Sequence, residues 1–135
     1  MSVDALRRAT TLLEADPVAQ AHVYANRAKA RMRSGAYGRA LRETQAGLRR
    51  VESLDAIEAV GARATLLAFR AEIRWQQGRA REAIRLAEAA VADAERANDL
   101  PALAIAYTAL VGSYQLLGEP VFFFNDTATT EIYTE

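Results

Sequence analysis

The chain has 135 residues, with 17 lysines and arginines balanced by 17 aspartates and glutamates, one histidine and no cysteine. This length suits a single domain with a modest core. The zero net charge argues against a nucleic acid or an anionic membrane as partner, because both need a surplus of basic side chains on one face. Without cysteine, disulfide bonds, thiolate zinc sites and thiol nucleophiles are excluded, and a single histidine provides no histidine-based metal cluster.

The sequence contains no feature of an enzyme or of an exported protein. A basic segment followed by an apolar run, which marks a secretory signal, is missing at the N-terminus. No uninterrupted apolar run approaches the roughly 20 residues that cross a bilayer. No phosphate-binding loop or nucleophile elbow occurs either. We therefore expect a cytoplasmic, non-catalytic protein without a cofactor, a metal or a membrane partner.

The alanine-rich composition, together with glycine, proline and capping residues at short intervals, predicts an all-α fold of six helices. The apolar fraction is 51% with only 7% aromatic residues, which favours closely packed helices over sheets. We expect Gly35 and Gly78 to end helices in the left-handed conformation, Ser53–Asp55 to cap the fourth helix, and Asn98–Pro101 to begin the sixth. The expected helices cover about residues 3–15, 18–34, 37–52, 80–97 and 101–117, and the fourth runs from the cap at Ser53–Asp55 to Gln77.

An internal repeat emerges when Gly35, Gly78 and Gly118 are aligned, at intervals of 43 and 40 residues. Small side chains recur at fixed distances from the first two glycines: Ala40 and Ala83 follow by five positions, and Ala28 and Ala71 precede by seven. Such residues let two antiparallel helices approach closely where they cross. Because one helix pair cannot bury its own apolar face, we expect successive pairs to stack.

The segment Gly35-Ala36-Tyr37-Gly38-Arg39-Ala40-Leu41 resembles the Gly-x-Tyr-x-x-Ala-Ile/Leu stretch of the tetratricopeptide repeat. Residues 78–84 have the same form without the aromatic, and Asp16-Pro17 resembles the closing Asp-Pro of that family. The resemblance covers about residues 3–120 and implies a right-handed superhelical stack of antiparallel helix pairs. It divides the chain into a half repeat 1–17, repeats 18–54 and 55–98, and a partial repeat 99–120.

The half repeat 1–17 and the partial repeat 99–120 each consist of a single helix. The first segment resembles the second helix of a preceding repeat, with apolar positions filled by Ala5, Ala9, Leu12 and Leu13. The sixth helix lacks a partner helix. Its apolar face, which we assign to Leu103, Ala106, Leu110, Tyr114 or their neighbours, is therefore expected to be exposed.

In tetratricopeptide proteins the first helices line a concave groove that receives a peptide. Carried over position by position, the resemblance implies the groove residues His22, Asn26, Lys29, Arg33, Thr65, Phe69, Glu72, Trp75, Gln76, Thr108 and Gln115. Phe69 and Trp75 are the expected anchors, because aromatic residues contribute much of the energy of interfaces. The alternative for Trp75, which we favour slightly, is packing between adjacent repeats.

The repeats are longer than usual, and this form resembles the helical region that follows the ATPase module in large bacterial regulators. The first hypothesis is accordingly a protein–protein interaction scaffold that binds a protein or peptide partner. The alternative is a regulatory or sensor segment of a larger bacterial signalling ATPase, nucleotide cyclase or transcription activator. A phosphate-binding loop or cyclase motif upstream, or a helix-turn-helix downstream, would favour the alternative.

After Pro120 the composition changes abruptly, since arginine and leucine disappear while threonine and phenylalanine dominate. Residues 125–134 resemble the conceptual translation of a sequencing-adaptor oligonucleotide, preceded by Phe122–Phe124. We therefore expect residues 121–135 to be artefactual and the chain to be a fragment. Deleting them is expected to leave the helicity nearly unchanged.

Overall fold

The structure, a computed structural model, describes residues 2–119 without the side chains of residues 12 and 13. This part of the chain is all-α, with no strand, which confirms the predicted fold class and the number of helices. The helices are α1 (Val3–Ala15), α2 (Pro17–Arg33), α3 (Tyr37–Val51), α4 (Ile57–Gln76), α5 (Ala80–Ala97) and α6 (Leu100–Leu117). The expected artefactual tail, residues 121–135, lies outside the described residues.

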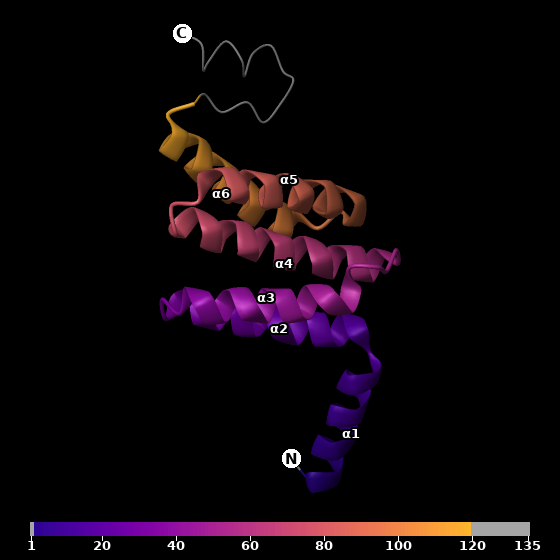
Figure 1. Cartoon of the computed structure of the whole chain (residues 1–135). Helices are drawn as coiled ribbons and strands as arrows, with labels where there is room; N and C mark the ends of the chain where they lie inside the picture. The colour runs from indigo at the N-terminus through magenta and orange to yellow at the C-terminus, as the bar shows by residue number, and fades with distance from the viewer. Residues whose placement is uncertain (1, 120–135) are drawn as a thin grey trace.

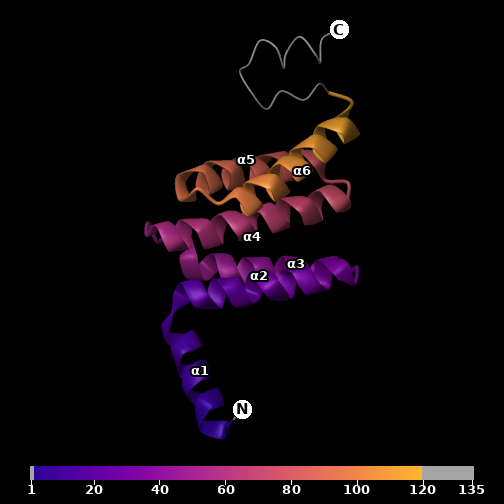
Figure 2. The same ribbon diagram turned by 180° about the vertical axis from the view of Figure 1, so that it is seen from behind.

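Helices α2 to α6 form a stack of layers, from which α1 leads away (Figure 1). Helix α2 pairs with α3, α4 pairs with α5, and α6 packs on both α4 and α5. Helix α4 also contacts α2, whereas no Cα atom of α3 lies within 8 Å of one in α5. The view from behind also shows α4 between the α2–α3 pair and helices α5 and α6 (Figure 2). The fold is therefore an open stack in which α2, α4 and α6 contact in succession.

Left-handed residues end four of the helices. Gly35 and Gly78 both have φ +78°, and Gly118 has φ +68°. At Gly35, the amide of Ala36 donates to the carbonyl of Arg31 at 2.8 Å, so the last carbonyls of α2 are satisfied. Asn98 ends α5 in the same way, with φ 52°. The sequence analysis had assigned Asn98 only to the start of the next helix.

Small residues hold the helices of the stack close together. Ala28, Ala40, Ala71 and Ala83 are all fully buried. Between α4, α5 and α6 the core consists largely of three alanine groups: Ala64 with Ala94 and Ala102, Ala68 with Ala90 and Ala106, and Ala71 with Ala87 and Ala109. Helices that meet through alanine approach more closely than helices that meet through leucine. A larger side chain at these positions would therefore push the helices apart.

Helix α1 does not join the stack as the second helix of a half repeat would. Its described side chains are exposed, including those of Ala5 and Ala9, which the sequence analysis placed on an apolar, packed face. Only Asp16 separates α1 from α2. Asp16 has φ −112° and ψ 103°, and its side chain caps α2 by accepting from the amides of Val18 and Ala19. One extended residue does not reverse the chain, so α1 projects away from α2.

The exposed face of α6 differs from the expected one. Ala106 and Leu110 are buried at 0% and 6% exposure, while Leu103 and Tyr114 are half-buried. These residues point towards α4 and α5 because α6 packs on both helices. The uncovered side of α6 instead carries the neighbouring residues Leu100, Ala104, Thr108, Gln115 and Leu116.

Candidate functional site

Helices α2, α4 and α6 present one continuous face, on which most of the predicted groove residues lie. On α2, His22, Asn26, Lys29 and Arg33 are exposed and follow one another at intervals of three or four residues. This spacing places them on the same side of the helix. On α4, Glu72 is half-buried and Gln76 exposed on the side that faces this row.

A hollow of about 400 Å³ lies on this face, near the ends of α2 and α4. It gathers five of the predicted groove residues, namely Lys29, Arg33, Phe69, Glu72 and Gln76. Three further residues that the sequence analysis did not assign to the groove complete its lining, namely Met32, Tyr37 and Ile105. Side chains from α2, α3, α4 and α6 therefore share one site, which we name the inner groove.

The inner groove combines an apolar floor with charged side chains. Phe69 is only 8% exposed and belongs to a buried cluster that also contacts Met32 and Ile105. Lys29 and Arg33 are exposed, and no described carboxylate lies within 4.0 Å of either. Their charges are therefore available to a partner. The arrangement suits a ligand that has an apolar group next to an acidic one.

Glu72 is the acidic member of the groove. It makes no ion pair within the described residues. Burial beside the apolar floor raises the pKa of this carboxyl, because removal from water disfavours its charged form. A ligand that donates a hydrogen bond, or that brings a positive charge, would relieve this cost.

A second hollow of about 530 Å³ lies where α4 and α6 begin, and it contains His22. Ile57 and Glu58 of α4 and Leu100 and Pro101 of α6 contribute to its lining. His22 thus lies apart from the inner groove, although it shares the exposed row of α2. Asn26 occupies the same row between the two hollows.

Trp75 is not part of the inner groove. Its indole ring lies directly on Gly112 of α6, so closely that a Cβ atom at position 112 would overlap the ring. This is the packing between adjacent units that the sequence analysis gave as the alternative. Trp75 is half-buried, and Gly112 itself is buried. The glycine makes room for the ring, which fixes α6 against α4.

The remaining predicted groove residues do not line the inner groove. Thr65 and Thr108 each donate a hydrogen bond to the carbonyl four residues earlier, at 3.3 and 3.0 Å. Gln115 is exposed near the end of α6. These three residues therefore contribute nothing to the inner groove.

An arginine of α4 fixes the first helix pair to the second. Arg63 donates from Nε to Asp93 Oδ2 at 2.7 Å and from Nη2 to Asp93 Oδ1 at 3.2 Å. Its Nη1 lies 3.2 Å from each of the carbonyl oxygens of Val51, Glu52 and Leu54. The pKa of Arg63 is raised, chiefly by the hydrogen bond to Asp93. One side chain thus caps the end of α3 and joins it to α5.

The N-cap that the sequence analysis expected for the fourth helix at Ser53–Asp55 does not form. Helix α4 begins at Ile57, and its N-cap residue Ala56 makes no side-chain hydrogen bond to the helix. The loop before α4 is instead held by Arg63, one and a half turns into that helix. No local pattern in the sequence indicates this contact, because its partner Asp93 lies 30 residues away.

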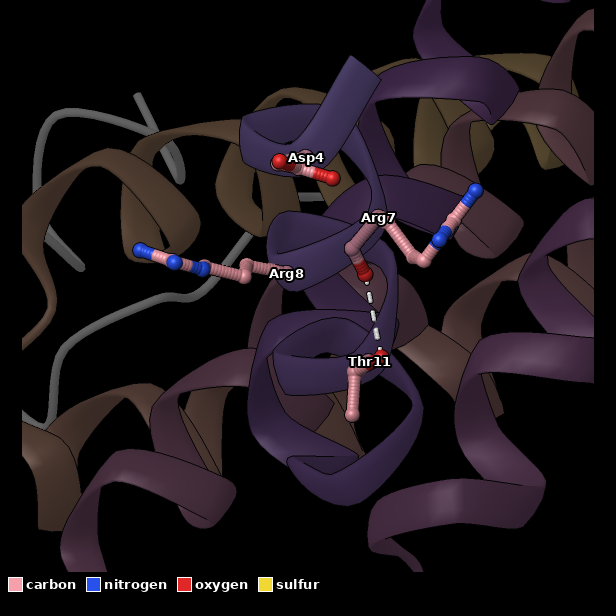
Figure 3. A pocket seen from close by; sticks show the side chains of 4 residues that line it. All are labelled: Asp4, Arg7, Arg8 and Thr11. Carbon is pink, nitrogen blue, oxygen red and sulfur yellow. Dashed lines mark hydrogen bonds between the residues drawn. The ribbon is translucent and has the colours of Figure 1, made fainter. Parts of the chain in front are cut away.

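A further hollow, of about 600 Å³, lies on α1, and its described lining consists of Asp4, Arg7, Arg8 and Thr11. Figure 3 shows that the side chains of Arg7 and Arg8 point to opposite sides, while Thr11 donates to the carbonyl of Arg7. All four residues are exposed on one helix, and no other described element forms an opposing wall. This hollow therefore lacks the enclosure of a binding site.

No family model, curated protein or solved structure matches this chain. Among residues 2–119, no group of three or more His, Asp or Glu side chains is placed to hold a metal ion. Within the part of the chain that the structure describes, one helix, α6, is long and apolar enough to cross a membrane by length and composition, and a third of it is buried in the stack. The sequence analysis predicted no membrane-spanning segment here, because polar residues interrupt the apolar run.

Proposed function

We propose that this chain is a non-catalytic interaction module of the tetratricopeptide type, which binds a segment of another protein in the inner groove. The observation that carries the proposal is the groove itself. The hollow is lined by Lys29 and Arg33 of α2, the first helix of one pair, and by Phe69 and Glu72 of α4, the first helix of the next pair. A site that spans two consecutive units suits an extended or helical peptide better than a small molecule held by a single loop.

The groove also indicates the chemistry of the bound segment. An apolar side chain would occupy the floor over Phe69 and Met32. An acidic side chain next to it would pair with Lys29 or Arg33, which have no ion-pair partner of their own in the described chain. We therefore expect ligands with one apolar anchor flanked by aspartate or glutamate.

The proposal is tested by peptide display against the immobilised chain, followed by titration of the enriched peptides by fluorescence anisotropy. Lys29→Glu/Arg33→Glu reverses the groove charge, and we expect it to weaken binding about tenfold or more. Arg81→Glu/Arg85→Glu is the matched control. It makes the same charge change on the outer face of α5, where both arginines are exposed, and it should leave binding unchanged.

Two results would contradict the proposal. Failure to enrich any peptide from a diverse library would argue against a peptide-binding groove. Enriched peptides that bind the groove variant and the control variant equally well would place the binding surface elsewhere. Circular dichroism of both variants verifies that the helices are intact, so that neither result reflects unfolding.

A further inference from the structure

The second hollow, which contains His22, lies on the same face of the stack as the inner groove. On α2, His22 and Lys29 are seven residues apart and belong to one exposed row. On α4, Glu58 lines the second hollow, whereas Phe69 and Glu72 line the inner groove. Intervals of about seven and eleven residues return a helix to nearly the same side. A chain segment laid along these helices therefore contacts both sites.

The separation of the two sites suits a short peptide. Glu72 follows Glu58 by 14 positions on α4, which corresponds to about 21 Å along the helix axis. An extended segment of about six or seven residues has this length. The side chains between the two sites, Asn26 on α2 and Thr65 on α4, are uncharged, and Thr65 donates to the carbonyl of Gly61. One extended segment can therefore reach from one site to the other without covering a charge between them.

The two sites carry opposite charges. The inner groove contains the cations Lys29 and Arg33, whose charge Glu72 offsets only in part. In the second hollow the charged residues of the described lining are Glu58 and Asp99, with no lysine or arginine among them. The electrostatic potential along this face therefore changes sign between the two sites. Such a face selects the orientation of a charged ligand as well as its sequence.

Both carboxylates of the second hollow are available to a ligand. No basic side chain in the described part of the chain lies within 4.0 Å of Glu58 or Asp99. Asp99 accepts from the amide of Ala102 through Oδ1, at 3.1 Å. Its Oδ2 faces Gly61, where an added Cβ atom would lie 3.7 Å away. The cap of α6 thus occupies one oxygen of Asp99 and leaves the other directed towards the hollow.

The second hollow also exposes apolar surface. Ile57, which contributes to its lining, is 53% exposed. This exposure does not arise at an end of the chain, because α4 lies between the α2–α3 pair and helices α5 and α6 (Figure 1). An exposed isoleucine beside carboxylates matches a side chain with an aliphatic stem and a positive head group. Lysine and arginine have this form.

We propose that the segment bound in the inner groove continues into the second hollow, where its lysine or arginine lies beside Glu58 and Asp99 with the aliphatic stem on Ile57. This inference rests on the proposed function, which it makes more specific. The bound segment has an acidic end and a basic end, separated by about six residues in extended form. It binds in one orientation only, because the reverse orientation would bring like charges together at both sites.

A double-mutant cycle on the peptides enriched by display tests the contact. The variant Glu58→Gln/Asp99→Asn removes both charges, and asparagine retains the cap of α6. We expect alanine in place of the peptide's basic residue to weaken binding to the wild type about tenfold and to leave binding to this variant unchanged. Glu88→Gln/Glu95→Gln makes the same charge change at exposed positions of α5 and should behave like the wild type. Circular dichroism verifies that each variant is helical.

The orientation is measured with the single tryptophan of the chain, Trp75, which lies at the inner-groove end of α4. A nitroxide spin label, a short-range quencher of tryptophan fluorescence, is attached to either end of an enriched peptide that lacks tryptophan. We expect the label at the acidic end to quench Trp75 more strongly than the label at the basic end. Equal quenching, or the opposite order, would overturn the proposed orientation.

Failure of this inference is distinguishable from failure of the proposed function. Peptides that lose affinity for Lys29→Glu/Arg33→Glu but bind Glu58→Gln/Asp99→Asn as tightly as the wild type would overturn the inference and leave the inner groove as the binding site. Peptides that are insensitive to Lys29→Glu/Arg33→Glu, or a library from which nothing is enriched, would overturn both.

Discussion

Two junctions of this chain use the same cap but send the chain in different directions. Asp16 begins α2 and accepts from the amides of Val18 and Ala19, while Asp99 begins α6 and accepts from the amide of Ala102. A proline stands in the first turn after each of them. Before Asp99 stands Asn98 in the left-handed conformation, and α6 folds back onto α5. Before Asp16 the helix simply ends at Ala15, and α1 projects from the stack. The cap determines where a helix begins, whereas the preceding residue determines the direction of the previous helix.

The comparison extends to energetics, because the stack and α1 differ in what they bury. The stack contains the alanine core, the Trp75–Gly112 contact and the Arg63 network. Helix α1 contributes no residue to any buried cluster among the described residues. Substitutions in the stack should therefore change the free energy of unfolding, while equivalent substitutions on α1 should not. The following predictions test this contrast in order of decreasing effect.

Arg63→Ala should have the largest effect, because it removes the carbonyl contacts after α3 and leaves Asp93 partly buried without its main partner. The two side chains are only 15% and 13% exposed. We expect a loss of about 3–5 kcal/mol in the free energy of unfolding, measured by urea denaturation. Arg96→Ala is the control, because Arg96 also approaches Asp93, at 3.8 Å, but is 54% exposed. Its cost should stay below about 1 kcal/mol; equal costs would refute the role of the Arg63 network.

Gly112→Ala should cost about 1–3 kcal/mol, because the added methyl group must displace the indole of Trp75. Gly38→Ala serves as the control. Its methyl group would meet only the end of Arg42, at 3.8 Å, near the start of α3. That substitution should be neutral or stabilise by up to about 1 kcal/mol. Repeating Gly112→Ala in a Trp75→Ala background should remove most of the cost, and a cost unchanged there would place its origin elsewhere.

Insertion of an asparagine between Ala15 and Asp16 should make the α1–α2 junction similar to the α5–α6 junction. The inserted residue can adopt the left-handed conformation that Asn98 has, which lets α1 turn back towards α2. We expect the amides of α1 to exchange with deuterium about tenfold more slowly. An inserted alanine is the control, since the left-handed conformation is costly for it. Equal protection in both insertions would mean that chain length alone directs α1.

Glu72→Gln should have the smallest effect, and that effect should depend on pH. Burial raises the pKa of Glu72 in the folded chain, so the folded state holds its proton more tightly than the unfolded state does. The contribution of Glu72 to stability therefore falls as the pH rises through and above the ordinary glutamate range. The variant should gain stability relative to the wild type as the pH rises through and above the ordinary glutamate range. Thermal denaturation at several pH values measures this gain, and an equal loss of stability in the wild type and in Glu72→Gln as the pH rises would refute it.

The sequence predicted the features that depend on local chemistry. Gly35, Gly78 and Gly118 could be recognised as helix ends because glycine enters the left-handed region without strain. The groove residues on α2 and α4 came instead from the resemblance to the tetratricopeptide repeat. Met32 and Ile105 were missed, because residues between the core and the exposed face have no pattern of their own.

Features that depend on distant contacts could not be read in the same way. Arg63 is one of many arginines in the chain, and nothing near it in sequence indicates that its partner is Asp93. Packing of Trp75 between units was a favoured alternative, but the sequence did not indicate that Gly112 is its partner. The projection of α1 was also missed, because its composition fits a second helix although Asp16 alone joins it to α2.

The lack of contact between α3 and α5 has a mechanical consequence. Because no Cα atom of α3 lies within 8 Å of one in α5, the outer side of the stack is joined through α4 and through the bridge from Arg63 to Asp93. A change in the curvature of the stack would have to stretch this bridge, so Arg63 resists bending.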